Sequence, residues 1–510
     1  MKVLDCTLRD GGYYTNWDFD GELVQKYFSS FEKLPVDYLE IGYRSLPEKE
    51  YRGRFYYLPN FVIDEITQLS KNKLLAIMLN EKSVQPKNLD KILDGLAPVI
   101  SLIRLAVDPK NFDSALLLGE AIRKRGFDVA FNLMYMSKYA NDESFLGKLS
   151  SLNGLASYVN MVDSYGGMVP EQVKILIHNV KSYCREAIGF HPHNNMELAF
   201  ANSLAAIDAG CEIVDTTVMG MGRGAGNLRT ELLLTYMASK NKLELDFNVL
   251  ASLIEAWMPL YRKYEWGTNL PYMFSGGNSL PQKDVMEWVS QRFYSYNCII
   301  QALHNQKSGE ADNIRLPVFN PNKSFDNVIV VGGGPSAILH ADAIKRFIDK
   351  LGNVCVIHAS SKNAKKYDDV EVPQYFCLVG NEGHRLEVTF QQLEHFYGQC
   401  ILPPYPRKMG TYIPERIKNS CYELEDILFT NKYKDAHTAL ALQTALNLSA
   451  KQVFLVGYDG YTNEAMTMRE QGLVNENEYL FSSFQKTKID LVSLLQTNYS
   501  IRINSVYEMI

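Results

Sequence analysis

Two histidines separated by one proline, His191-Pro192-His193, carry the strongest chemical signal in the sequence. They follow a short apolar run at 187–190 that is typical of the end of a β-strand. Residues i and i+2 of a strand point to the same face, about 7 Å apart, so both imidazoles can reach one metal ion. The spacing alone is equally consistent with two surface histidines in a loop.

A second expected strand end, at residues 4–12 (LDCTLRDGG), favours the metal interpretation. Two imidazoles and one carboxylate leave open positions on a divalent cation, and this ligand set suits Mn²⁺ or Mg²⁺, with Zn²⁺ as an alternative. We therefore predict a metal site at Asp10, His191 and His193 that chelates the keto oxygen of a 2-oxo acid. The forked guanidinium of Arg9 matches a carboxylate and would stabilise carboxylate or enolate charge.

The elements that must position these groups alternate regularly over residues 1–220. Apolar, β-branched runs recur with helical spacing between them, as at 21–34 and 197–209. This alternation predicts a (β/α)₈ barrel, with a doubly wound sheet of similar size as the alternative, and barrel chemistry sits where the strands end. The expected strands are 3–6, 38–43, 74–79, 100–107, 129–135, 158–162, 188–191 and 213–218. The polar residues expected at their ends are Arg9, Asp10, Glu40, Asn132, Asp163, Ser164, His191, His193 and Asp215.

The order of four short motifs resembles the metallolyases of the Asp-Arg-Glu barrel superfamily, which include hydroxymethylglutaryl-CoA lyase, isopropylmalate synthase and 4-hydroxy-2-oxovalerate aldolase. The motifs are LRDG at 8–11, DS at 163–164, FHPHNN at 190–195 and GRGAGN at 222–227, and the last is most similar to the 4-hydroxy-2-oxovalerate aldolases. The resemblance covers roughly residues 1–275. It implies metal ligands at Asp10, His191 and His193, enolate stabilisation by Arg9 and binding of the pyruvyl carboxylate by Ser164.

Tyr13 departs from this pattern, because aldolases of this type carry a histidine, the presumed base, four residues after the arginine. A free tyrosine has a pKa of about 10, so its phenolate costs about 4 kcal/mol at pH 7 unless the metal or Arg9 lowers that pKa. We predict a catalytic position for Tyr13, as an acid or as the group that positions a water; a packing aromatic is the alternative. We expect a different substrate rather than a lost metal site.

Three further residues are expected to contact substrate at the barrel mouth, namely Glu40, Asn132 and Arg104. For Glu40 there are two alternatives to substrate contact. It could orient Arg9 or a ligand, or it could have a purely structural role. The loop at 222–227 offers backbone N–H groups to an anion, and it is also consistent with a tight turn after the eighth strand.

The sequence predicts four parts, which are a barrel at 1–245, a helical extension at 246–307, a linker at 308–325 and a Rossmann-like α/β domain at 326–510. In the last part a glycine-rich turn follows an expected strand, where its N–H groups would cradle a phosphate. The G-x-G-x-x-G fingerprint and the P-loop lysine are both lacking. The turn and a second strand end are similar to nucleotide-binding domains of sialyltransferase-like and pterin-pyrophosphokinase-like proteins, and a domain used for assembly is the alternative. The candidate nucleotide-binding residues are Gly332, Gly333, Gly334, Ser336 and Asp459.

The composition of the chain limits the classes of binding partner and the cellular compartment that we expect. The chain has 46% hydrophobic and 22% charged residues, a net charge of −6 and no basic block, which disfavours nucleic acid and anionic membranes. No apolar run reaches the roughly 18 residues that span a bilayer, and the N-terminus lacks signal-peptide features. Eight scattered cysteines without a C-x-x-C pair disfavour a secreted disulfide framework. We expect a cytoplasmic enzyme that forms a homodimer.

Together these features predict a divalent-metal aldolase, a carbon–carbon lyase that makes or breaks a bond next to a pyruvate-type enolate. Its substrates would be small 2-oxo acids and aldehydes. One alternative is a Claisen-type, acyl-CoA-dependent acyltransferase on the same barrel. Another is a bifunctional enzyme whose C-terminal domain transfers a nucleotidyl or glycosyl group. The last is a scaffold with a relict site.

Overall fold

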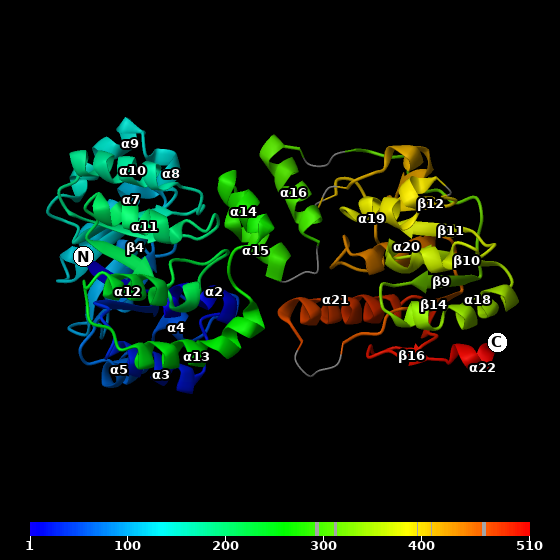
Figure 1. Ribbon diagram of the computed structural model, residues 1–510, viewed down its shortest axis with the longest axis horizontal. Coiled ribbons are helices and arrows are strands. Elements are labelled where there is room, and N and C mark those ends of the chain that lie inside the picture. The colour runs from blue at the N-terminus through cyan, green and yellow to red at the C-terminus, as the bar shows by residue number, and fades with distance from the viewer. Residues whose placement is uncertain (291–294, 311–313, 395, 408, 410, 462–465) are drawn as a thin grey trace. The chain divides into compact units, whose positions relative to one another are not determined.

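The computed structural model describes residues 1–290, 295–310, 314–394, 396–407, 409, 411–461 and 466–510 (Figure 1). Contacts between residues divide the chain into two units, Met1–Met286 and Glu287–Ile510, and each is described by itself. The four-part division expected from the sequence stays a prediction. Residues 291–294 of the expected extension and 311–313 of the expected linker lie outside the described residues.

The first unit is built on a closed barrel of eight parallel strands that pair in sequence order. Strand β1 also pairs with β8, with Leu4 opposite Asp215, and this pairing closes the barrel. The closed barrel confirms the predicted (β/α)₈ architecture and excludes a doubly wound sheet for this unit. The strands are β1 (Lys2–Asp5), β2 (Tyr38–Tyr43), β3 (Leu74–Asn80), β4 (Ile100–Val107), β5 (Asp128–Leu133), β6 (Tyr158–Asp163), β7 (Ala187–Pro192) and β8 (Ile213–Thr216).

Amphipathic helices surround the barrel. The carboxylate of Asp20 caps the start of α3 by accepting the N–H groups of Glu22 at 2.9 Å and Leu23 at 3.2 Å, and the helix then buries one stripe against the strands. The helices before the extension are α1 (Thr7–Asp10), α2 (Gly12–Thr15), α3 (Gly21–Phe31), α4 (Arg54–Tyr57), α5 (Asn60–Leu69), α6 (Leu89–Ile92), α7 (Phe112–Arg123), α8 (Met136–Tyr139), α9 (Glu143–Lys148), α10 (Pro170–Tyr183), α11 (Ala199–Asp208) and α12 (Thr230–Ser239).

Three more helices follow the barrel, α13 (Phe247–Tyr264), α14 (Leu270–Gly277) and α15 (Gln282–Ser290). Hydrogen bonds join this region to the loops that follow β7 and β8. Trp266 donates its indole N–H to the carbonyl of Met219 at 2.9 Å, and Asn195 donates its amide to the carbonyl of Tyr272 at 3.0 Å. These helices therefore contact the carboxyl end of the barrel.

The second unit contains an all-parallel eight-stranded sheet in the order β13-β12-β11-β10-β9-β14-β15-β16. The chain adds strands on one side of β9 and then crosses to the other side at β14, which is a doubly wound, Rossmann-like arrangement. The strands are β9 (Asn327–Val331), β10 (Val354–His358), β11 (Gln374–Cys377), β12 (Gln399–Leu402), β13 (Cys421–Glu423), β14 (Gln452–Val456), β15 (Asp490–Ser493) and β16 (Arg502–Ile503). The helices are α16 (Tyr296–Ser308), α17 (Ser336–Leu339), α18 (Ala341–Lys350), α19 (Glu382–Thr389), α20 (His437–Asn447), α21 (Met468–Phe484) and α22 (Val506–Met509).

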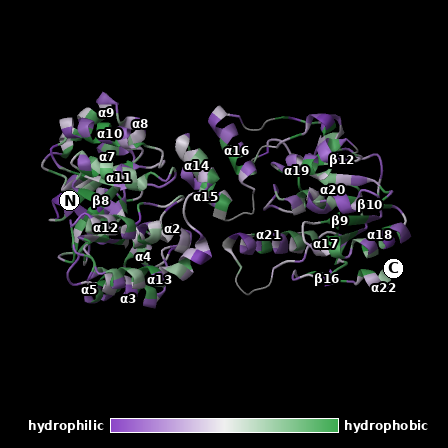
Figure 2. Ribbon diagram, in the orientation of Figure 1, coloured by the Kyte–Doolittle hydropathy of each residue, from purple (hydrophilic) through white to green (hydrophobic). Residues whose placement is uncertain are grey.

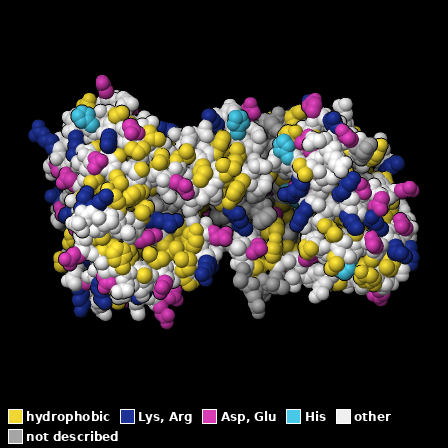
Figure 3. Space-filling model, in the orientation of Figure 1, with side chains coloured by type: hydrophobic (Ala, Val, Ile, Leu, Met, Phe, Trp, Pro, Cys, Tyr) yellow, Lys and Arg dark blue, Asp and Glu magenta, His cyan; other side chains and the backbone are white. Residues whose placement is uncertain are grey.

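Helices cover both faces of this sheet because alternate strand residues point to opposite sides. On β9, Val328 and Val330 face the core that holds α20 and α21, while Ile329 and Val331 face the core that holds α18. Figure 2 shows the strands of both units in green, the hydrophobic end of the scale. On the face seen in Figure 3, dark blue and magenta side chains are interspersed. Within the described residues, none of the helices combines the length and apolarity needed to span a bilayer.

Candidate functional site at the barrel mouth

A layer of polar side chains lies inside the barrel, directly above an apolar plug. The plug includes Tyr38, Leu102, Ala130, Tyr158 and Ile213. Two residues further along the same strands, and therefore on the same inward face, the side chains are polar and buried. This layer consists of Glu40, Arg104, Asn132, Asn160 and Asp215. The strands thus place this layer of polar side chains toward the carboxyl end of the barrel.

Arg9 and Asp10 lie on α1, the short helical turn that follows β1. The guanidinium of Arg9 donates through Nη1 to Asp10 Oδ1 at 2.6 Å and through Nε to Glu40 Oε2 at 2.7 Å. The indole N–H of Trp17 donates to the Arg9 carbonyl at 2.7 Å and fixes the turn. Glu40 therefore orients Arg9. This is one of the two roles that the sequence offered for Glu40 in place of substrate contact.

His191 and His193 lie at the end of β7, facing Asp10. Each of the three residues offers a ligand atom, and these atoms lie within 4.8 Å of one another. Nδ1 of His191 is 2.8 Å from Asp215 Oδ2, and Nδ1 of His193 is 2.8 Å from the carbonyl oxygen of Asp163. A carbonyl accepts only from N–H, so the free lone pair of His193 is on Nε2. Such partners fix ring orientation in metal sites.

The pKa values of Asp10 and His193 favour the forms that bind a cation, whereas the pKa of His191 is shifted in the opposite sense. Burial acts to raise the pKa of Asp10, but Arg9 and the two imidazoles outweigh burial, and the pKa lies well below its ordinary value. Burial, with the neighbouring His191, lowers the pKa of His193 to about 4. For His191 burial acts to lower the pKa, and hydrogen bonds with Asp10 and Asp215 reverse this and raise it. An ionised carboxylate and a neutral imidazole are the forms that bind a metal.

Asn227 completes the cluster. Its amide nitrogen donates to Asp10 Oδ2, whereas its Oδ1 is buried without a hydrogen-bond partner among the described residues. An unpaired buried oxygen beside a carboxylate and two imidazoles fits a divalent cation, which such an oxygen would ligate. Sequence reasoning missed this residue, since it used the segment 222–227 only for its backbone N–H groups.

A second group, Cys6, His191 and Asp215, also places ligand atoms close together. Burial raises the pKa of the Cys6 thiol well above its ordinary value, so this sulfur stays protonated. Asp215 is already paired with Arg104. Burial acts to raise the pKa of Asp215, and Arg104 and His191 outweigh burial and lower it. This group therefore orients His191 and is a poor metal site, and sequence reasoning had placed Asp215 at a strand end without a role.

The other predicted site residues lie at different depths. Arg104 is wholly buried and contacts Glu40 at 3.2 Å and Asp215, so it lies beneath the mouth. Asn132 is 3% exposed and accepts a hydrogen bond from Asn160 at 2.8 Å. Substrate contact by these residues stays a prediction.

Two predicted residues lie closer to the mouth. Ser164 is half-buried next to Asp163, whose carbonyl meets His193, and its hydroxyl accepts from the N–H of Tyr135 at 2.8 Å. Tyr13 is half-buried, and its ring makes an edge contact with Trp17 at a centroid distance of 5.0 Å. The guanidinium of Arg223 lies over the ring of Tyr13, 5.4 Å from the ring centroid. The roles assigned to Ser164 and Tyr13 also stay predictions.

In the second unit, the glycine-rich turn and Asp459 come together at the carboxyl ends of β9 and β14, where the strand order reverses. The carboxylate of Asp459 accepts the N–H of Ser336 at 3.1 Å and also the Ser336 hydroxyl. It therefore takes the place that a phosphate would occupy at the start of α17. A nucleotide at Gly332, Gly333, Gly334, Ser336 and Asp459 stays a prediction.

Comparisons with known proteins agree with the barrel geometry. The HMGL-like family model matches residues 108–256. An oxaloacetate decarboxylase of Mycobacterium tuberculosis is 26% identical over 243 residues, which are 47% of this chain and 71% of that protein. A 4-hydroxy-2-oxovalerate aldolase of Carboxydothermus hydrogenoformans is 30% identical over 242 residues, with 47% and 70% covered.

A crystal structure of the N-terminal domain of a candidate aldolase from Bacteroides vulgatus is similar to this chain with a TM-score of 0.56 and 50% identity. The similarity covers 59% of this chain and 100% of that domain. Both relatives and this domain match about half of the chain or a little more, which agrees with a barrel followed by a separate unit. By its barrel and these similarities, the chain belongs to the HMGL-like family.

Proposed function

We propose that the barrel is a divalent-metal aldolase that makes or breaks a carbon–carbon bond next to a pyruvate-type enolate, as a 4-hydroxy-2-oxo acid aldolase does. The observation that carries the proposal is the convergence of Asp10, His191 and His193 within 4.8 Å beside the buried, unpaired oxygen of Asn227. Mn²⁺ or Mg²⁺ suits an oxygen-rich set with open positions, and Zn²⁺ is the alternative.

The bound cation would supply Lewis-acid stabilisation of negative charge on a 2-oxo acid. Arg9 is held by Asp10 at 2.6 Å and Glu40 at 2.7 Å, so its guanidinium is fixed before substrate arrives. A fixed cation stabilises developing enolate charge without reorganising during the reaction. We propose that the hydroxyl of Ser164, which lies beside the residue whose carbonyl orients His193, donates to the substrate carboxylate.

Tyr13 is our candidate for the group that moves a proton at the reacting carbon. Its hydroxyl hydrogen-bonds to Tyr43, and burial together with Tyr13 raises the pKa of Tyr43 well above its ordinary value. Tyr43 therefore stays protonated at neutral pH and can donate to the Tyr13 oxygen. We propose that Tyr13 delivers and accepts this proton, directly or through one water.

Exchange of the methyl protons of pyruvate with solvent deuterium tests this proposal without knowledge of the aldehyde. The full chain with Mn²⁺ is expected to catalyse the exchange, because enolate formation is a step of the proposed reaction. His193→Ala should abolish it, and His178→Ala, an exposed histidine on α10, should leave it unchanged. No exchange by the full chain with Mn²⁺, Mg²⁺ or Zn²⁺ would sink the proposal. Activity only with acetyl-CoA present would indicate the Claisen-type acyltransferase instead.

We also propose that the second unit binds a nucleotide at the carboxyl edge of its sheet. Ser361 and Asn363 follow β10 and are 1% and 2% exposed, yet Ser361 Oγ and Asn363 Oδ1 have no partner among the described residues. Glu382, after β11, accepts the N–H of Ser361 at 2.6 Å and lies 3.6 Å from His437 Nε2. Unpaired buried groups at the carboxyl edge of a doubly wound sheet favour a ligand there.

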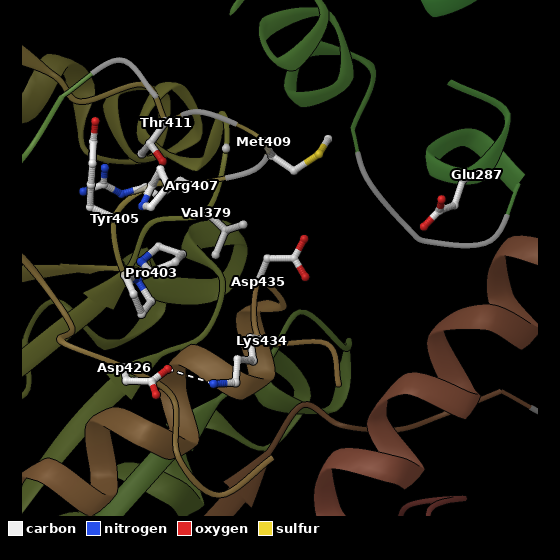
Figure 4. Close-up of a pocket in the computed structure, with 13 residues that line it drawn as sticks. Glu287, Val379, Pro403, Tyr405, Arg407, Met409, Thr411, Asp426, Lys434 and Asp435 are labelled. Carbon is white, nitrogen blue, oxygen red and sulfur yellow. Dashed lines mark hydrogen bonds and ion pairs between the residues drawn. The ribbon is translucent and has the colours of Figure 1, made fainter. Parts of the chain in front are cut away.

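A cavity of about 340 Å³ opens further along the same edge, after β11 and β12. Figure 4 shows Tyr405 and Pro403 at the left of the view and Lys434 below them, where it pairs with Asp426 at 2.8 Å. Its lining residues Gly380 and Asp435 are two residues from Glu382 and His437. Its size and mixed polar and apolar lining suit the sugar or base of a nucleotide.

Calorimetry of the full chain with nucleoside mono- and diphosphates, and with inorganic phosphate, tests the second site. Binding of at least one nucleotide, weakened in Asn363→Ala but not in Asn248→Ala on the barrel unit, is the expected result. No binding by any nucleotide would favour the alternative of an assembly domain.

A further inference from the structure

One half-buried cation at the barrel mouth has no counter-charge. Arg223 lies on the loop 222–227 after β8, and its guanidinium stacks over Tyr13 at 5.4 Å from the ring centroid. Across the described parts of the chain, Arg223 makes no ion pair and no side-chain hydrogen bond with a protein group. The charge of Arg223 is therefore available to an anion from outside the protein.

The other two guanidinium groups of the site are different. Arg9 pairs with Asp10 and Glu40, and Arg104 pairs with Glu40 and Asp215. Both are buried and each pairs with two carboxylates, so their charges are compensated within the protein.

Hydrogen bonds fix the loop that carries Arg223. The hydroxyl of Tyr14 donates to the carbonyl of Gly224 at 2.9 Å, and the N–H of Asn194 donates to the carbonyl of Gly226 at 2.8 Å. The backbone at Gly224 has a φ of +66°, which glycine adopts without strain, so the loop turns immediately after Arg223. The positive charge of Arg223 is near enough to His193 to contribute to lowering its pKa, after burial and His191.

Tyr13 contributes to this arrangement as well. A guanidinium stacked on an aromatic ring keeps its N–H edge free for hydrogen bonds to an anion. The bidentate match between this edge and a carboxylate or phosphate gives geometric selectivity in addition to charge attraction. The Tyr13 ring contact therefore leaves Arg223 able to pair with an anion beside the proposed metal ligands.

We propose that Arg223 selects an anionic reaction partner, an aldehyde that carries a carboxylate or phosphate group. The inference rests on the proposed aldolase function and names the class of its second substrate. In cleavage, the 4-hydroxyl of a 4-hydroxy-2-oxo acid loses its proton as the C3–C4 bond breaks. The electron pair of that bond passes to the enolate of pyruvate, and the enolate takes up a proton at C3. The products are pyruvate and an anionic aldehyde bound at Arg223.

Matched aldehydes test this assignment on the full chain with Mn²⁺. Butanal and 4-oxobutanoate differ in their terminal methyl and carboxylate groups, while glyceraldehyde and glyceraldehyde 3-phosphate differ by a phosphate. The wild-type protein is expected to favour the anionic member of at least one pair by tenfold or more in kcat/KM. The preferred pair distinguishes carboxylate from phosphate.

Arg223→Ala should lower kcat/KM for the preferred anionic aldehyde about 10–100-fold more than for its neutral match, mainly through KM, and Arg223→Lys should recover part of the loss. Arg123→Ala, which removes a guanidinium paired with Asp128 at the amino end of β5, should change neither value. Equal kcat/KM within both pairs, or an equal loss on both members in Arg223→Ala, would overturn the inference.

The exchange of pyruvate protons with solvent distinguishes a failure of the aldolase proposal from a failure of the role of Arg223. Exchange without selectivity between matched aldehydes would refute the role of Arg223 and leave the aldolase proposal standing. If the protein catalyses no exchange, calorimetric binding of 4-oxobutanoate and glyceraldehyde 3-phosphate still decides the role of Arg223. Binding that Arg223→Ala weakens by at least tenfold would support it, and equal binding by both proteins would contradict it.

Discussion

Replacing Asp215 by asparagine perturbs the charge that lies beneath the proposed metal site. Asp215 is 2% exposed, pairs with Arg104 and lies 2.8 Å from Nδ1 of His191. Asparagine keeps the shape but removes the charge, so the wholly buried Arg104 retains only Glu40, at 3.2 Å, as its counter-charge. Breaking a buried ion pair from one side costs about 3–5 kcal/mol, and we expect the free energy of unfolding to fall by that amount.

The same substitution weakens the acceptor for His191, a proposed metal ligand. Oδ2 of Asp215 accepts from Arg104 and also meets Nδ1 of His191, and a neutral amide oxygen in its place is a weaker acceptor for both. Loss of such an outer partner typically weakens metal affinity about 10–100-fold. We therefore expect the Kd for Mn²⁺ to rise by this factor.

Two measurements check both effects. Urea unfolding followed by tryptophan fluorescence reports mainly on the barrel unit, which holds three of the four tryptophans, Trp17, Trp257 and Trp266. Calorimetric titration with Mn²⁺ gives the affinity. Asp113→Asn is the matched control, because that carboxylate is 80% exposed and pairs with Lys148 on the surface. Wild-type stability and wild-type Mn²⁺ affinity in Asp215→Asn would refute the reasoning.

Three other predictions address separate parts of the molecule. Asn227→Ala should weaken Mn²⁺ binding about tenfold or more by calorimetry, since its unpaired oxygen is lost, and unchanged binding would remove it from the ligand set. Tyr13→Phe should slow pyruvate exchange about 10²–10⁴-fold and Tyr13→His should retain it, whereas full exchange in Tyr13→Phe would exclude proton transfer by this residue. Burial lowers the pKa of His358 to about 4 from its ordinary 6.5, so between these values the unfolded chain binds more protons. Stability of the second unit should therefore fall by about 3 kcal/mol as pH drops from 6.5 to 4, seen as lower protection factors for the amides of Val354–His358 after correction for the intrinsic exchange rate at each pH, and equal protection factors would contradict it.

Much of the fold could be predicted from the sequence because its periodicity is a local property. The apolar run at 38–43 coincides with β2, and the run at 100–107 coincides with β4. Both strands are buried on two faces, so their residues are almost continuously apolar. The metal-ligand motif was visible for a similar reason, since His191 and His193 share one face of one strand.

The connections across the barrel could not be predicted in the same way. The partners of Arg104 are Glu40 and Asp215, which lie 64 residues before it and 111 residues after it in the chain. Only closure of the barrel brings these three residues together. Arg104, which was expected at the barrel mouth, is therefore a buried partner of two carboxylates. In the second unit the sequence predicted that Asp459 contacts a ligand. In the structure its carboxylate instead accepts a hydrogen bond from the N–H of Ser336.

Stoichiometric binding of Mn²⁺, measured by electron paramagnetic resonance, tests the central claim most directly. The account predicts one Mn²⁺ for each full chain, no such site in the Asp10→Ala/His193→Ala double variant, and a changed spectrum of the bound ion when pyruvate or oxalate is added. Equal Mn²⁺ binding by the wild type and the double variant, or a spectrum that neither ligand alters, would contradict it.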